Sequence, residues 1–260
     1  MDFSTIHGVI MDMDGVLWRG DEILPGVAAF FDFLRARNLP FVLASNNSSK
    51  TPADYAAKLA SMGVGGVGEH QVVTSGTATV DYLQTHYPAG VPVHILGGDG
   101  LKALVSGAGF VLSDEARIVV VGIDFNLTYN KLKRAAALIR NGADFIGTNG
   151  DATFPLADVL APGAGSLLAA LKTATDRQPL VIGKPNKPMF EAALHTLGTE
   201  PQNTLMIGDR LDTDIQGAQA AGLQAALVFT GVTNAAILAA SDIQLEGIYD
   251  DLPALMAAWA

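Results

Sequence analysis

The sequence contains no cysteine, few charged residues and no long uninterrupted apolar run. Without cysteine, the chain cannot form disulfides, thiolate metal sites or a cysteine nucleophile. The apolar run at residues 118–121 has the length of a strand and is far too short to cross a bilayer. Residues 1–4 lack the basic and apolar regions of a secretory signal, so we expect a cytoplasmic protein.

Positive charge is also scarce, because 16 Lys and Arg residues stand against 26 Asp and Glu residues, for a formal net charge of −10. An acidic surface repels nucleic-acid phosphates, and no basic cluster offsets it, so we expect neither a nucleic-acid nor a membrane partner. Any anionic ligand must be held locally by a metal ion, a lysine or backbone amides. Apolar residues make up 49% of the 260 residues, enough for one large or two smaller folded domains.

Apolar segments that fit strands alternate with amphipathic segments that fit helices, which predicts an α/β fold with a parallel sheet covered on both faces. We expect strands at 8–11, 41–44, 180–182, 205–207 and 225–229, and helices from near residues 25, 51, 188 and 214. The stretch between Asn46 and Lys184 is far too long for one crossover and has strand and helix patterns of its own. We therefore predict a core of residues 1–77 and 181–260, with residues 78–180 inserted as a second domain.

Polar residues stand at the carboxyl ends of four expected strands: Asp12 with Asp14, Ser45 with Asn46, Lys184, and Asp209. Carboxylates two residues apart on a strand point to the same face, and placing them together is costly unless a cation shares them. A hard divalent cation with oxygen ligands would do so. Since ligands of doubly wound sheets bind outside these strand ends, the pattern predicts metal-assisted carboxylate chemistry there.

Four segments resemble the motifs of the haloacid dehalogenase superfamily, and more narrowly its subfamily IIA, the NagD-like or p-nitrophenyl phosphatase-like group. They are residues 12–18 (DMDGVLW), 45–47 (SNN), 183–185 (GKP) and 208–214 (GDRLDTD). The resemblance covers essentially the whole chain, including the long insertion between the second and third motifs. It implies a Rossmannoid, doubly wound parallel-sheet core, an inserted α/β cap of type C2a at residues 78–180, and Mg²⁺ as cofactor.

Phosphoryl transfer needs a nucleophile, charge neutralisation and a proton for the leaving oxygen. Asp12 is the candidate nucleophile, and Asp14 is the candidate general acid and base. The resemblance implies that Mg²⁺ is held by Asp12, the backbone carbonyl of Asp14 and Asp209. Dehalogenases lack the second aspartate because halide leaves without a proton, so Asp14 favours phosphate-ester chemistry.

Lys184 is expected to neutralise phosphate charge, while Ser45 and Asn46 donate hydrogen bonds to the phosphoryl oxygens. By resemblance, Asn47 lies at the same phosphate-facing turn and Asp214 supports Lys184 or the metal. Residues 148–151 (TNGD) face the active site in this group, although Gly150 replaces the commoner proline. The substrate's leaving group is expected to meet two further cap residues, Asn149 and Asp151.

These residues also have ordinary structural readings. Asp12 and Asp14 could form a solvated turn, residues 45–47 could supply turn chemistry, and Asp214 could be a helix N-cap. Residues 97–100 (GGDG) fit a turn before a helix at Leu101 better than a nucleotide loop. Trp18 either packs under the loop of the first motif or faces the substrate.

The sequence thus predicts a Mg²⁺-dependent phosphatase for small phosphorylated metabolites such as sugar phosphates, nucleoside monophosphates and p-nitrophenyl phosphate. A phosphotransferase or mutase using the same aspartyl-phosphate is one alternative, although the short gap between the first two motifs disfavours a mutase. A non-catalytic binding protein is the other alternative. A homodimer through the cap is a further possible assembly.

Overall fold

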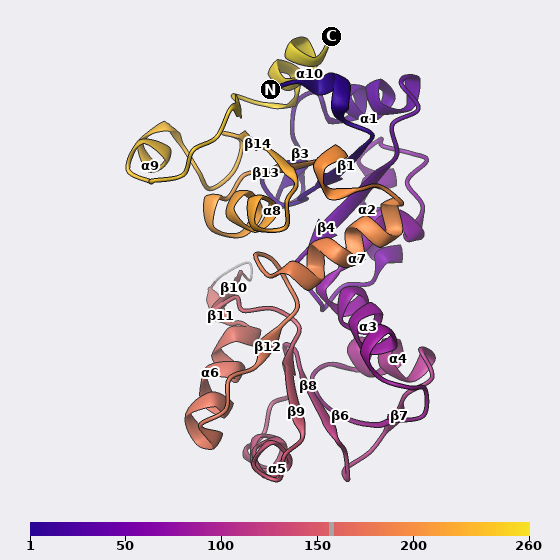
Figure 1. Ribbon diagram of the computed structural model, residues 1–260, viewed down its shortest axis with the longest axis vertical. Helices are drawn as coiled ribbons and strands as arrows, with labels where there is room; N and C mark the ends of the chain where they lie inside the picture. Colours follow the sequence, from indigo (N-terminus) through magenta and orange to yellow (C-terminus); the bar gives the residue numbers. More distant parts are fainter. Residues whose placement is uncertain (156–158) are drawn as a thin grey trace. The chain divides into compact units, whose positions relative to one another are not determined.

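The computed structural model describes residues 1–155 and 159–260, and the chain divides into two compact units (Figure 1). Unit 1 comprises Met1–Ser45, Pro52–Val73 and Phe190–Ala260, and unit 2 comprises Asn46–Thr51 and Thr74–Met189. Each unit is built on its own sheet with accompanying helices, in agreement with the predicted α/β class. The predicted boundaries after residues 77 and 180 differ from this division, which falls after residues 73 and 189.

The six-stranded sheet of unit 1 has the order β15-β14-β13-β1-β4-β5. Its strands are β1 (Gly8–Met11), β4 (Phe41–Ser45), β5 (Val72–Thr74), β13 (Thr204–Gly208), β14 (Gln224–Val228) and β15 (Gly247–Tyr249). The central strand β1 pairs in parallel with β4 and β13, and β14 pairs in parallel with β13 and β15. From β1 the chain adds β4 and β5 on one side and β13 to β15 on the other, so the strand order reverses between β1 and β13.

Helices and a short hairpin complete unit 1. The hairpin is formed by β2 (Trp18–Arg19) and β3 (Glu22–Ile23). The α-helices are α1 (Val27–Ala36), α2 (Pro52–Ser61), α8 (Gln216–Ala220), α9 (Ala235–Ala239) and α10 (Leu252–Trp259), together with the part of α7 (Lys187–Leu197) that follows Met189. Single turns of helix occur at η1 (Phe3–Thr5), η2 (Glu69–Gln71), η3 (Pro201–Asn203) and η4 (Leu211–Ile215).

The core of unit 1 follows from the apolar patterns of its strands and of α1. All four residues of β1 are buried, as a central parallel strand requires. In α1 the buried residues recur at helical spacing and pack into the same cluster as β1 and β4: Val27, Phe30, Phe31 and Leu34. This packing fixes the carboxyl end of β1, where the first motif begins.

Unit 2 contains a five-stranded parallel sheet of order β12-β9-β8-β6-β7. Its strands are β6 (Pro92–Leu96), β7 (Val111–Leu112), β8 (Ile118–Val121), β9 (Asp144–Gly147) and β12 (Leu180–Val181). The helices are α3 (Ser75–His86), α4 (Asp99–Gly107), α5 (Tyr129–Arg140) and α6 (Ala164–Thr175), and β10 (Thr153–Pro155) pairs antiparallel with β11 (Leu160–Pro162). None of the helices in the described parts of the chain is long and apolar enough to cross a membrane.

The prediction that residues 180–182 form a strand of the core sheet is wrong. Leu180 and Val181 pair in parallel with β9 of unit 2. The amides of Ile182 and Gly183 then donate to the carbonyls of Gly147 and Thr148, so the segment follows the edge of that sheet. A short apolar run carries no information about which of two parallel sheets it joins, and for this reason the sequence pattern misplaced it.

Candidate active site

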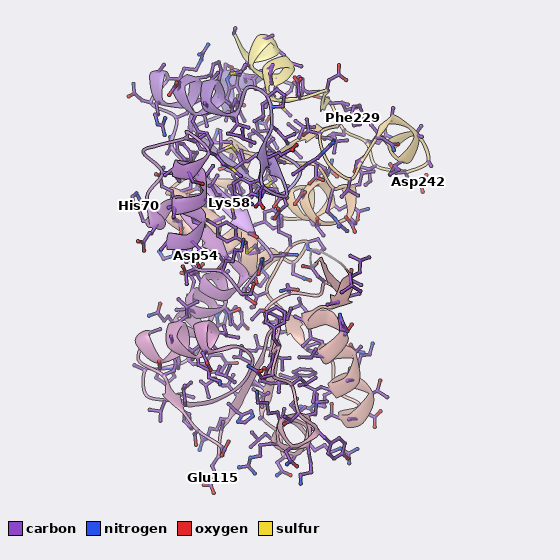
Figure 2. The ribbon with its side chains drawn as sticks, turned by 180° about the vertical axis from the view of Figure 1, so that it is seen from behind. Asp54, Lys58, His70, Glu115, Phe229 and Asp242 are labelled. Atoms are coloured by element: carbon purple, nitrogen blue, oxygen red, sulfur yellow. The ribbon has the colours of Figure 1, made fainter. Side chains whose placement is uncertain are left out.

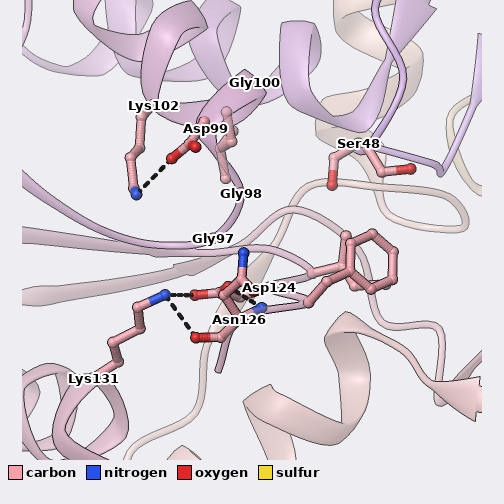
Figure 3. A pocket seen from close by; sticks show the side chains of 13 residues that line it. Ser48, Gly97, Gly98, Asp99, Gly100, Lys102, Asp124, Asn126 and Lys131 are labelled. Carbon is pink, nitrogen blue, oxygen red and sulfur yellow. Dashed lines mark hydrogen bonds and ion pairs between the residues drawn. The ribbon is translucent and has the colours of Figure 1, made fainter. Parts of the chain in front are cut away.

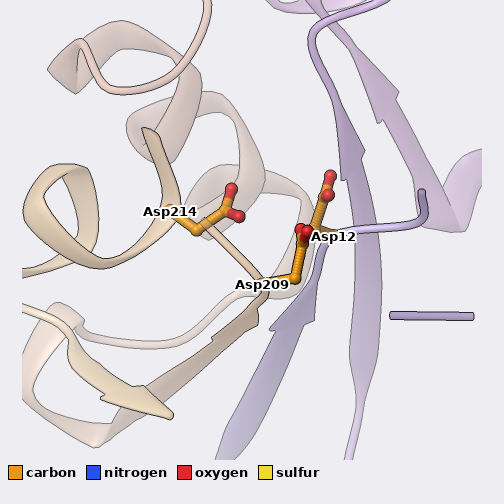
Figure 4. Close-up of side chains that lie close together, drawn as sticks. All are labelled: Asp12, Asp209 and Asp214. Atoms are coloured by element: carbon orange, nitrogen blue, oxygen red, sulfur yellow. The ribbon is translucent and has the colours of Figure 1, made fainter. Parts of the chain in front are cut away.

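Three carboxylates meet at the carboxyl ends of β1 and β13, where the strand order of unit 1 reverses (Figure 4). Oxygen atoms of Asp12, Asp209 and Asp214 all lie within 4.8 Å of one another. Asp209 is 1% exposed and Asp214 is 0% exposed. Buried carboxylates at this spacing repel one another unless positive charge is shared among them, and an all-oxygen donor set suits Mg²⁺. The residues present therefore fit the predicted cation.

Backbone groups orient the two aspartates that follow β13. The amide of Val232 donates to Asp209 Oδ2 at 2.6 Å, and the amide of Arg210 donates to Asp214 Oδ2 at 3.1 Å. Asp214 lies inside the turn η4, so it does not hold the N-cap position that was its alternative reading. By contrast Asp212 is partly exposed, and hydrogen bonds from Arg210 hold its pKa below the usual value.

The loop after β1 folds closely against Asp209. Gly15 has a φ of +86°, and a Cβ atom built on it would lie 2.6 Å from Asp209 Oδ2. Its amide donates to the Trp18 carbonyl at 2.8 Å, while Thr230 Oγ1 donates to the Gly15 carbonyl at 2.6 Å. A residue with a side chain would meet both a left-handed backbone and a steric clash here. The sequence signal was the glycine itself, but its partner is almost two hundred residues away.

The second carboxylate of the first motif, Asp14, lies outside the three-carboxylate cluster. Its side chain is exposed, and its Oδ1 accepts a 2.8 Å hydrogen bond from Trp18 Nε1. Trp18 itself is 0% exposed. Of the two readings of Trp18, the structure therefore shows packing beneath the loop.

The second motif divides between the two units. Ser45 ends β4 in unit 1, where its hydroxyl lies 3.3 Å from that of Tyr55. In unit 2, Asn47 Oδ1 accepts hydrogen bonds from the amide and hydroxyl of Ser49, at 2.8 and 2.7 Å. This is the local turn chemistry that the sequence allowed as the alternative for Asn47.

Within unit 2, the structure brings four predicted residues together. Asn46 Nδ2 donates to the Lys184 carbonyl at 3.0 Å and to Asp151 Oδ1 at 3.2 Å. Asn149 Nδ2 donates to the Asn46 carbonyl at 2.8 Å, and Asn149 Oδ1 accepts from the Asp151 amide at 3.1 Å. Asn149 is only 5% exposed and Lys184 only 4%. The side chain of Asn46 thus joins the segments that carry the second and third motifs, and the side chain of Asn149 joins the second motif to residues 149–151.

Unit 2 also contains a cavity of about 240 Å³ at the carboxyl ends of β6 and β8 (Figure 3). Its lining includes residues 97–102, where the predicted turn leads into α4 at Asp99, two residues before the expected start. Lys131 lies 2.7 Å from the buried Asp124, and Lys102 lies 2.9 Å from Asp99. Each lysine thus faces a carboxylate, so these pairs present no net charge to an anionic ligand.

Family models match two parts of the chain. A haloacid dehalogenase-like hydrolase model matches residues 9–111, and a HAD-hydrolase-like model matches residues 181–255. Among curated proteins, a 5'-nucleotidase YutF of Bacillus subtilis is 39% identical over 231 residues, covering 88% of this chain and 90% of that protein. An acid sugar phosphatase of Staphylococcus saprophyticus is 37% identical over 226 residues, covering 86% of each chain.

Solved structures give the same picture over nearly the full length. NagD from Escherichia coli K-12 has a TM-score of 0.89 and 32% identity, covering 95% of this chain and 97% of its own. A 4-nitrophenylphosphatase from Thermotoga maritima has a TM-score of 0.92 and 35% identity, covering 99% of each chain. The similarity therefore includes unit 2 as well as unit 1.

Proposed function

Because this chain belongs to the haloacid dehalogenase-like hydrolases and is a phosphoric monoester hydrolase, we propose that it is a Mg²⁺-dependent phosphatase acting through an aspartyl-phosphate on Asp12. The resemblance predicted from the four motifs is confirmed at the level of the family. The observation that carries the proposed mechanism is the cluster of Asp12, Asp209 and Asp214. Relatives named as phosphatases favour this activity over a non-catalytic binding protein.

In this proposal, Asp12, the Asp14 carbonyl and Asp209 hold the Mg²⁺ ion, and Asp214 supports them. When bound, the ion supplies positive charge that offsets the carboxylates and the phosphoryl oxygens. The burial of Asp209 and Asp214 supports this assignment, since buried anions need such compensation.

The reacting groups come from the first motif. An Asp12 oxygen forms a bond to phosphorus, and the bond between phosphorus and the substrate oxygen breaks while Asp14 gives that oxygen a proton. Asp14, now ionised, takes a proton from a water molecule that attacks phosphorus. The phosphorus–Asp12 bond breaks, inorganic phosphate leaves, and both aspartates return to their starting forms. The exposed position of Asp14 supports a role in exchanging protons with substrate and water.

The second and third motifs are proposed to bind the phosphate. Lys184 supplies a point charge, and Ser45, Asn46 and Asn47 supply hydrogen-bond donors. The hydrogen bonds that link Asn46 to Lys184 and Asp151 support a shared role for these residues. Contact of Asp151 and Asn149 with the leaving group stays a prediction. The side-chain amide of Asn149 is buried and donates to the Asn46 carbonyl, which favours a role in holding the second motif in place.

The names of the relatives guide the proposed substrates. They include a 5'-nucleotidase and acid sugar phosphatases, so we propose nucleoside monophosphates and sugar phosphates as the substrate classes. Unit 2 is proposed to be the cap that reads the leaving group. The cytoplasmic location and a homodimer through the cap stay predictions from the sequence.

The test is release of inorganic phosphate from a panel of sugar phosphates, nucleoside monophosphates and p-nitrophenyl phosphate, with Mg²⁺ and with EDTA. We expect EDTA to abolish turnover, and Asp12→Asn to lower it by at least about 10³-fold, as loss of a nucleophile does elsewhere. Asp212→Asn is the matched control, because this aspartate is partly exposed and lies two residues from Asp214. Metal-independent turnover, or full activity in Asp12→Asn, would refute the proposal.

A further inference from the structure

The indole of Trp18 makes a specific contact with Asp14. Its Nε1 donates to Asp14 Oδ1 at 2.8 Å, although Trp18 is fully buried and Asp14 is exposed. An indole N–H is a donor only and does not titrate, so it can hold a carboxylate without competing for that group's proton. The contact engages Asp14 Oδ1 and leaves the second oxygen for the proton transfer proposed above.

Helix α2 fixes the indole ring in this position. The ammonium of Lys58 lies 4.5 Å from the centroid of the Trp18 ring, and its Nζ also donates to the Gly20 carbonyl at 2.6 Å. The Tyr55 ring stacks against the indole, with centroids 6.3 Å apart and planes 14° apart. Tyr55 and Lys58 are three residues apart and so share one face of α2. Lys58 is labelled in Figure 2, and its side chain is only 18% exposed.

The main chain adds a second constraint on the same residue. The carbonyl of Trp18 accepts from the Gly15 amide at 2.8 Å, and its amide donates to the Met13 carbonyl. Asp14 and Trp18 also form a backbone bridge. Both ends of the hydrogen bond between indole and carboxylate are therefore held by a closed loop of the backbone.

A polar contact continues from this ring stack to the second motif. The Tyr55 hydroxyl lies 3.3 Å from Ser45 Oγ, and both side chains are almost completely buried. One row of contacts in unit 1 thus runs from Ser45 through Tyr55 and Trp18 to Asp14. The proposed acid and the proposed phosphate-binding hydroxyl share a rigid aromatic support.

We propose that Trp18 is a positioning residue for Asp14, whose indole N–H holds the carboxylate in the orientation that delivers a proton to the leaving oxygen. This inference rests on the proposed phosphatase mechanism. The need for positioning depends on the substrate, because an alcohol leaves poorly without a proton whereas nitrophenolate leaves readily without one. The effect of losing the hydrogen bond should therefore depend on the leaving group.

The test compares Trp18→Phe with the wild type on a sugar phosphate and on p-nitrophenyl phosphate. We expect kcat/KM to fall about 10- to 100-fold for the sugar phosphate, within the range of general acid catalysis, and several times less for the aryl ester. Trp259→Phe is the matched control, since it changes the other tryptophan, on α10. In an Asp14→Asn background, Trp18→Phe should cause no further loss of selectivity, because the two groups act as one unit.

A replacement that keeps the size and shape of the indole ring separates the loss of the hydrogen bond from any effect of Trp18→Phe on folding. In the Trp259→Phe protein, Trp18 is replaced by benzothienylalanine, in which sulfur takes the place of the N–H. The same dependence on leaving group is expected, with an unchanged circular dichroism spectrum. Equal losses on both substrates, or none, would overturn the positioning role of Trp18. Failure of the phosphatase mechanism is seen separately, as turnover that survives Asp12→Asn.

Discussion

Single residues of this protein illustrate how a strand end becomes a charged site. Asp12, Asp14 and Asp209 could be selected from the sequence because each follows an apolar strand. Their supports were only partly predictable. The packing of Trp18 beneath the loop was one of two alternatives, whereas the contacts of Gly15 with Asp209 and of Tyr55 with Ser45 are not encoded in a local pattern. A glycine or an aromatic residue near a motif has many ordinary uses, and only the folded structure shows which use applies.

Gly15→Ala tests the close approach of the first loop to Asp209. The substitution adds a Cβ atom 2.6 Å from Asp209 Oδ2 and places alanine at a φ of +86°. The left-handed backbone alone costs about 1–2 kcal/mol, and the clash displaces a proposed metal ligand. We expect lower unfolding free energy in denaturant titration and a large loss of phosphate release.

Gly20→Ala is the matched control for this substitution. Gly20 also has a positive φ, +56°, but nothing lies within 4 Å of the added Cβ. Gly20→Ala should lower the free energy of unfolding by a similar amount, because alanine must adopt a left-handed backbone there. The variant should keep most of its phosphatase activity. If the two variants lost activity equally, the close approach of Gly15 to Asp209 would not be needed for activity.

At the scale of elements, the alternation of strands and helices was predictable, whereas the membership of one strand was not. The run at 180–182 is apolar, as a buried parallel strand should be, but Leu180 and Val181 pair with β9 in the sheet of unit 2. This error also misplaced Lys184, which was expected at the end of a strand of the core sheet. Lys184 instead follows β12, the edge strand that pairs with β9. Its backbone carbonyl accepts a hydrogen bond from the Asn46 side chain.

Asn149→Ala tests the link between Asn46 of the second motif and residues 149–151. The change removes the donor to the Asn46 carbonyl and the acceptor for the Asp151 amide. Each lost hydrogen bond costs about 1 kcal/mol, so we expect a clear drop in the unfolding free energy measured by denaturant titration. Hydrolysis of all substrates should fall together.

Asp151→Ala provides the comparison. If Asp151 contacts the leaving group, its removal should change relative rates among sugar phosphates and nucleotides more than it changes hydrolysis of p-nitrophenyl phosphate. A stable Asn149→Ala protein with altered substrate preference would reverse the two assignments, placing Asn149 at the leaving group instead.

At the scale of the whole molecule, the chain forms two parallel sheets, one in each unit, and a long insertion separates its second and third motifs. The unusual distance between the second and third motifs predicted two units, because no single crossover needs so many residues. The exact points of division were not predictable, since one falls within β5 (Val72–Thr74) and the other within α7 (Lys187–Leu197), where no turn or linker composition marks a boundary. NagD and the 4-nitrophenylphosphatase are similar to this chain over 95% and 99% of its length, so the similarity extends over both units.

The central claim is that Asp12 carries the phosphoryl group during turnover, and trapping it is the most direct measurement. Enzyme quenched during Mg²⁺-dependent hydrolysis is treated with borohydride, which reduces an acyl phosphate but leaves a free carboxylate intact, and is then analysed by peptide mass spectrometry. We predict homoserine at position 12 in the wild type, more of it in Asp14→Asn, and none without substrate. Reduction at a different residue, or turnover in Asp14→Asn without any reduced residue, would contradict the account.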